Sequence, residues 1–145
     1  MRLVIQRVRE ASVSIDGKEI SRIGQGLLIF LGIGMEDTGK EVEYWARKVV
    51  NLRIFSDEND KMNLSVLDIK GSLLVVSQFT LYGEIDSGAR PSFSSAARPE
   101  QAIPLYEDFV ARCRAAGAPT ETGEFGAMMQ VALVNDGPVT IIGNT

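Results

Sequence analysis

Hydrophobic and polar residues alternate along the N-terminal part of the chain, a pattern that predicts β-strands. The alternation is loose over Leu3–Val8 and clean over Ala11–Ile15, where valine and isoleucine alternate with serine. Asp16-Gly17 is a strong signal for a two-residue hairpin turn. Strands over Lys18–Ile23 and Leu27–Ile33 follow, so we expect this part of the chain to form an antiparallel meander.

The pattern changes to helical spacing in two later segments. Thr38–Leu52 places apolar residues on one face, and Thr38 followed by Glu41 is the sequence of a capping box. Glu100–Ala116 shows the same spacing and predicts a second helix. Pro104 lies near the start of that helix, where we expect it to delay the first full turn.

The remaining segments predict further strands and one long loop. Strands are expected at Arg53–Ser56, Asn63–Val66, Ser72–Leu81, Thr120–Phe125, Met129–Val134 and Val139–Ile142. Tyr82–Pro99 is irregular, with a length typical of functional loops as well as of surface connections. The fold class predicted is a single α+β domain over residues 1–145. Its sheet is mostly antiparallel or mixed and barrel-like, with two main helices packed on it.

A four-residue insertion, Asn135-Asp136-Gly137-Pro138, divides the last two predicted strands. Proline has no backbone donor and is confined in sheets to edges, ends and bulges. Glycine permits a positive φ or a close approach of the backbone to another group. We therefore predict that the strand breaks here and exposes backbone carbonyls, although a plain bulge or tight turn also explains the local pattern.

Composition narrows the possible chemistry. The chain has no histidine and a single cysteine, which removes the usual zinc ligand sets and the Ser-His and Cys-His nucleophile pairs. A net charge of −4 argues against wrapping of long nucleic acid but is compatible with a small site for one RNA end. The single cysteine and the lack of a bilayer-length apolar run predict a cytoplasmic protein.

The segment Ser77-Gln78-Phe79-Thr80-Leu81 is the first candidate for a reactive site. It ends the most hydrophobic strand, so its backbone N–H groups are candidates for an oxyanion hole. The alternative is a strand end at which serine and threonine satisfy a turn.

Other candidates are weaker. Arg90-Pro91-Ser92-Phe93 could meet a phosphate or a base, or could be a loop anchored by a buried Phe93. Cys113 falls on the apolar stripe of the second helix, which predicts a buried and inert thiol. The acidic residues Asp57, Glu58, Asp60 and Asp68 show no ordered ligand spacing, so we predict solvated turns, with no metal and no cofactor.

Together, the segments at 77–81, 90–93 and 135–140 closely resemble the D-aminoacyl-tRNA deacylase family, and the resemblance covers the whole chain. It includes Ile5-Gln6-Arg7-Val8 and Arg53-Ile54-Phe55-Ser56-Asp57. The resemblance implies a homodimeric, metal-independent esterase with active sites at the subunit interface. Its partner is the 3′ end of aminoacylated tRNA, with no DNA and no membrane. Such enzymes release D-amino acids, and glycine mischarged on tRNA for alanine, while L-aminoacyl-tRNA is spared.

The resemblance also implies roles for particular residues. Ser77, Gln78, Phe79 and Thr80 would form the cradle for the terminal adenosine and the ester. Gly137 and Pro138 would form a cis motif that enters the partner's active site and excludes L side chains through main-chain carbonyls. Supporting roles fall to Arg7, which would brace the partner's Gly-Pro loop, to Asn135 and Thr140 of the motif, and to Phe125 and Met129 as pocket-lining candidates.

The mechanism must be argued separately, because Thr80 has no histidine to accept its proton. We favour hydrolysis assisted by the 2′-hydroxyl of the substrate, with the protein positioning the ester and stabilising charge. Two other classes of function remain open on the sequence alone: a non-enzymatic binder of an RNA end or small ligand, and a dimerisation domain without a site. Release of D-tyrosine or glycine from charged tRNA would distinguish the esterase from both.

Overall fold

The sheet is built around one long strand, β1 (Arg2–Ile15), in a computed structural model that describes residues 1–145. β1 pairs antiparallel with β2 (Lys18–Ile23), β3 (Gly26–Gly32) and β8 (Gln130–Asn144). β3 continues in parallel to β6 (Ser72–Ser77), and β6 continues in parallel to β7 (Thr120–Thr122). The remaining elements are α1 (Gly39–Asn51), β4 (Phe55–Ser56), β5 (Met62–Leu64), the 3₁₀ turn η1 (Phe79–Tyr82) and α2 (Pro99–Ala115).

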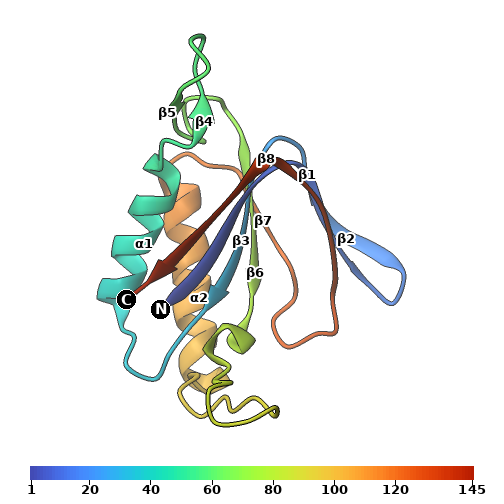
Figure 1. Ribbon diagram of the computed structural model, residues 1–145, viewed down its shortest axis with the longest axis vertical. Helices are drawn as coiled ribbons and strands as arrows, with labels where there is room; N and C mark the ends of the chain where they lie inside the picture. The colour runs from blue at the N-terminus through green and yellow to red at the C-terminus, as the bar shows by residue number, and fades with distance from the viewer.

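Both helices lie on the same side of the curled sheet (Figure 1). Alternate residues of β3 explain why both faces of the sheet are apolar. Leu27, Ile29 and Leu31 belong to a core of 25 buried residues that includes both helices, whereas Leu28 belongs to a second cluster of seven residues on the other face. Burial on both faces accounts for the continuous apolar run of β6. The predicted α+β architecture with a mixed, barrel-like sheet and two helices is confirmed.

Local sequence signals specify the first hairpin and the first helix as predicted. Asp16 and Gly17 both have positive φ, 51° and 76°, as a tight hairpin turn with matching twist requires. Thr38 caps α1, and its capping box with Glu41 is complete. No helix is long and apolar enough to cross a membrane.

The second helix differs from the prediction at its start. α2 begins at Pro99, and Pro104 lies inside the helix rather than delaying it. Pro99 occupies the first turn, where a missing N–H costs nothing. Pro104 is exposed to solvent, so water can satisfy the carbonyl that its missing N–H leaves free.

Several predicted strands are shorter than the pattern suggested. β6 ends at Ser77 rather than Leu81, because the chain turns into η1; β7 ends at Thr122, and β5 ends at Leu64. The two C-terminal strands are instead one, β8, with an irregularity inside it. Gln6 pairs with Thr140 and Val8 with Asn135, so residues 136–139 stand opposite Arg7 alone. The predicted break is therefore a bulge within a continuous strand.

Candidate active site

A cavity of about 370 Å³, here called the β6 cavity, opens where β6 ends. Ser77 and Phe79 line it from the first predicted motif, and Phe125 lines it from the segment after β7. Phe93 lines it from the long loop and packs edge-on against Phe79, with ring centroids 5.2 Å apart. The structure thus brings two of the predicted motifs together. Phe93 is 37% exposed rather than buried, so its ring is available at the cavity.

The turn at Phe79 leaves backbone donors free. The first hydrogen bond of η1 runs from the Leu81 N–H to the Gln78 carbonyl at 3.2 Å. The Phe79 and Thr80 N–H groups precede it and therefore have no acceptor within the turn, and no side chain caps them. The Gln78 side-chain amide donates to the Thr80 hydroxyl, which is exposed. This arrangement can stabilise negative charge, but an amide cannot take a proton from Thr80.

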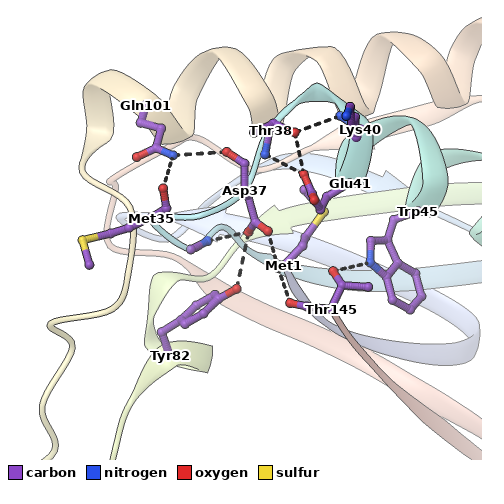
Figure 2. A network of polar contacts seen from close by, with 11 residues as sticks. Met1, Met35, Asp37, Thr38, Lys40, Glu41, Trp45, Tyr82, Gln101 and Thr145 are labelled. Carbon is purple, nitrogen blue, oxygen red and sulfur yellow. Dashed lines mark hydrogen bonds and ion pairs between the residues drawn. The ribbon is translucent and has the colours of Figure 1, made fainter.

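A buried polar network holds η1 in place (Figure 2). The Asp37 carboxylate accepts from the Met1 amino group at 2.6 Å, from the Gly34 N–H at 2.7 Å and from the Tyr82 hydroxyl at 3.4 Å. Burial, reinforced by the charge of Asp37, raises the pKa of Tyr82 to about 12, so this hydroxyl stays protonated and can donate. Arg2 lies 4.5 Å above the Tyr82 ring and donates to the Leu81 carbonyl at 2.9 Å.

The sequence does not reveal this network as a support for the site. Its members lie far apart in the chain, so no local pattern connects Asp37 with Met1 and Tyr82.

The Gly137–Pro138 bulge is fixed by polar side chains. Arg7 donates from Nε to the Asp136 carbonyl at 3.0 Å and from Nη1 to the Ile54 carbonyl at 2.8 Å. Asn135 Nδ2 donates to the carbonyls of Arg7 and Val139, at 2.9 and 3.0 Å. The Gly137–Pro138 peptide bond is cis, and Gly137 has a φ of 123°.

The supporting residues hold this bulge within their own chain. Thr140 donates to the Asn135 Oδ1 at 3.4 Å, which links two of the predicted supporting residues. Arg7 contacts the Gly-Pro segment of its own chain, and a contact with a partner's segment stays a prediction.

The bulge and the β6 cavity lie apart within one chain. Arg7, opposite the bulge, pairs with Leu27 of β3, whereas Ser77 pairs with Leu31. The bulge and the end of β6 are four residues apart along the strand direction, which is about 13 Å. They are also three strand spacings apart across the sheet, which is about 14 Å. The structure therefore does not bring Gly137 and Pro138 to the cavity of their own chain.

Two further predictions concern residues near the end of the sheet. Phe125 lines the β6 cavity and also packs on Tyr106, with ring centroids 6.1 Å apart, and its role in the site stays a prediction. Met129 does not line this cavity. It lies just before β8 and packs against the second core cluster, on the other face of the sheet, and its sulfur accepts from the Glu124 N–H at 3.4 Å.

The remaining candidates have structural roles. Cys113 is fully buried, and burial raises the pKa of its thiol to about 12. Asp57 accepts from the Asn59 and Lys61 N–H groups of its own turn, and these backbone bonds hold its pKa below the usual range. No group of three or more His, Cys, Asp or Glu side chains is arranged to hold a metal ion.

Comparison with known proteins places the chain in a family. The family model described as D-Tyr-tRNA(Tyr) deacylase matches residues 4–144. The chain belongs to this family. Relatives from Thermosipho africanus and Koribacter versatilis, both named D-aminoacyl-tRNA deacylase, are 57% and 59% identical over 98% of the chain and 95% of their own length. The family resemblance seen in the sequence is therefore confirmed.

Solved structures agree with the fold. A structure described as c-Myc DNA Unwinding Element Binding Protein superposes with a TM-score of 0.95 at 45% identity, covering 100% of this chain and 99% of that one. A probable eukaryotic D-amino acid tRNA deacylase superposes with a TM-score of 0.80 at 16% identity, covering 98% and 97% of the two chains, and shares the fold.

Proposed function

We propose that this protein hydrolyses the ester bond of D-aminoacyl-tRNA and releases free tRNA and the D-amino acid. The observation that carries this proposal is the near full-length identity, 57% and 59%, to proteins named for that activity. The β6 cavity supplies a physical site for it. The cavity ends at the exposed rings of Phe79 and Phe93, and aromatic faces of this kind can stack on an unpaired base such as the terminal adenine.

Backbone groups perform the proposed chemistry at this site. As water attacks the ester carbonyl, negative charge develops on the carbonyl oxygen, and the free N–H groups of Phe79 and Thr80 are the donors placed to stabilise it. The Thr80 hydroxyl has an amide neighbour and no base, so it is a poor nucleophile. We assign the activation of water to the 2′-hydroxyl that the substrate carries beside the ester.

A modified substrate tests this mechanism directly. Charged tRNA ending in 2′-deoxyadenosine is expected to react very slowly, while it still competes with the ordinary substrate for binding. Full turnover of the deoxy substrate would remove the 2′-hydroxyl from the mechanism and return attention to Thr80.

We further propose that Gly137 and Pro138 act as a chirality filter in the active site of a second copy. Two features support this. The bulge lies far from the cavity of its own chain yet is held by Arg7 and Asn135. β8, which pairs only with β1, also leaves Ile142 77% exposed, and an apolar side chain this exposed on an edge strand is compatible with a protein contact there. A rigid backbone wall beside the Cα rejects L residues whatever their side chain, and it admits glycine, including glycine mischarged on tRNA for alanine.

A hydrolysis assay tests the proposed activity. Purified protein is incubated with tRNA charged with D-tyrosine, L-tyrosine or glycine, and released amino acid is measured with and without EDTA. We expect release of D-tyrosine and glycine, retention of L-tyrosine and no effect of EDTA. Absence of release from every substrate would favour a binding module.

Light scattering tests the homodimer. We place the enzyme in the cytoplasm, where its substrate is formed.

DNA binding is the second candidate, because the 45% identical structure is described as a DNA unwinding element binding protein. The net charge of −4 disfavours it, since duplex binding relies on neutralising many phosphates. Competition separates the two: duplex DNA should leave deacylation unchanged, and strong inhibition at physiological salt would favour the DNA-binding function.

A further inference from the structure

Unpaired positive charge gathers in one pocket at the C-terminal end of α1. This pocket, here called the cationic pocket, has a volume of about 470 Å³ and is lined by Tyr44, Arg47, Lys48, Asn51, Leu52 and Arg53. None of its three cations takes part in an ion pair, although Arg7, Arg9, Arg22 and Arg112 all do. No carboxylate lines it. Arg53 lies near enough to Asp68 for its charge to lower the pKa of that carboxyl, but Asp68 does not line the pocket. In a chain of net charge −4, three cations in one concave site favour an anionic ligand.

The fold alone does not account for all three charges. Lys48 lies in the last turn of α1, where a cation stabilises the helix dipole. Arg53 follows the helix end, where a cation still stabilises the dipole, and its charge also lowers the pKa of Asp68. Arg47 precedes the last turn and has neither role. Tyr44 adds an exposed ring, 42% accessible, with the Lys48 ammonium 5.4 Å from its centroid. Exposed cations around an accessible aromatic ring are typical of surfaces that contact RNA.

The position of the pocket connects it to the proposed substrate. Arg53 directly precedes Ile54, whose carbonyl accepts from Arg7, and Arg7 also holds the Gly137–Pro138 bulge through Asp136. The cationic pocket and the bulge therefore lie at the same end of the molecule. In the dimer proposed above, in which the bulge enters the partner's active site, the cationic pocket of the same chain would come close to that site and to the tRNA bound there.

We propose that the cationic pocket binds backbone phosphates of the acceptor arm of aminoacylated tRNA, with Arg47, Lys48 and Arg53 as the cations. The inference rests on the proposed function and adds a second point of contact beyond the terminal adenosine. Phosphate contacts of this kind increase affinity and position the substrate without reading its sequence. They also make binding dependent on salt, because each neutralised phosphate releases counterions.

The test compares two double variants that remove the same charge. Arg47→Ala with Lys48→Ala removes two of the three cations of the cationic pocket. Lys18→Ala with Lys40→Ala removes two exposed, unpaired lysines elsewhere. Each protein is assayed on D-tyrosyl-tRNA and on the D-tyrosyl ester of adenosine, which carries no phosphate. KM for the tRNA is measured between 50 and 200 mM salt.

We expect the cationic-pocket variant to lower kcat/KM on the tRNA relative to the adenosine ester at 50 mM salt. Two phosphate contacts correspond to about a tenfold change in affinity between 50 and 200 mM salt. The ratio of KM for the tRNA at 200 mM to KM at 50 mM should therefore be about tenfold smaller in this variant than in the wild type. The control variant should keep the wild-type salt dependence.

Three results would overturn the proposal. They are an unchanged salt dependence in the cationic-pocket variant, an equal loss on both substrates, and the same loss in the control variant. Each can occur while the wild type still deacylates both substrates, so failure of the pocket is distinguishable from failure of the proposed function.

Discussion

Arg7→Ala should destabilise the protein and weaken chiral discrimination, whereas Arg9→Ala should do neither. Both arginines reach Asp136, but they differ in burial: the Arg7 side chain is 11% exposed and the Arg9 side chain is 76% exposed. Arg7 donates to two backbone carbonyls, those of Asp136 and Ile54. Arg9 makes only a solvent-exposed contact with the carboxylate.

The magnitudes follow from these contacts. Hydrogen bonds from charged groups contribute roughly 1.5–3 kcal/mol each, so the loss of two in Arg7→Ala should cost about 3–6 kcal/mol. For a chain of this size, that lowers Tm by roughly 6–24 °C. An exposed ion pair contributes about 0–1 kcal/mol, so Arg9→Ala should stay near the wild type. Arg7→Lys should fall between them, because a single ammonium cannot reproduce two divergent hydrogen bonds.

Two measurements test the prediction together. Urea unfolding gives the free energy of unfolding, and hydrolysis of D- and L-tyrosyl-tRNA gives the ratio of kcat/KM values. Arg7→Lys, or Arg7→Ala where it folds, should raise the relative rate on the L substrate because the bulge is less firmly held. The reasoning is refuted if Arg7→Ala matches Arg9→Ala in stability and keeps the wild-type discrimination.

Three further predictions concern the site and its supports. Thr80→Ala should keep turnover within about tenfold of the wild type, whereas loss of a nucleophile costs about 10³-fold or more; a loss of that size with intact binding would contradict the mechanism. Gly34→Ala should cost about 1–3 kcal/mol in urea unfolding, because its Cβ would lie 2.6 Å from the Tyr82 hydroxyl oxygen. Gly24→Ala, with nothing within 4 Å of its Cβ, is the control and should be neutral, so equal losses would argue against the clash. The Cys113 thiol, with its pKa raised to about 12, should not gain reactivity toward a disulfide reagent between pH 7 and 9 in the folded protein. In denaturant its reactivity should rise with an ordinary thiol pKa of about 8.5, and a similar rise in the folded protein would show that the thiol is accessible.

The sequence predicted an element best where the residues that form its structure are neighbours in the chain. The capping box of Thr38 and Glu41 and the Asp16-Gly17 turn are examples, because their geometry is determined within a few residues. The end of β6 was predicted too late, since Phe79 and Leu81 alternate with Gln78 and Thr80 in a strand-like pattern that only the tertiary turn into η1 interrupts.

The candidate site was predictable in its parts but not in its arrangement. Ser77, Phe79 and Phe125 line one cavity, and their functional roles stay predictions. The separation of Gly137 from that cavity depends on the register of β1 with β3 and β8, which no local pattern encodes. The support of η1 by Asp37 was likewise invisible, because it joins residues distant in the chain.

Hydrolysis of D-aminoacyl esters and rejection of L-aminoacyl esters by the backbone are the activity proposed for this chain. The most direct test is the time course of amino acid release from D-tyrosyl-tRNA and L-tyrosyl-tRNA by the wild-type protein under identical conditions. We expect rapid release of D-tyrosine, with L-tyrosine lost only at the rate seen in buffer. Release of both at similar rates would contradict the proposal.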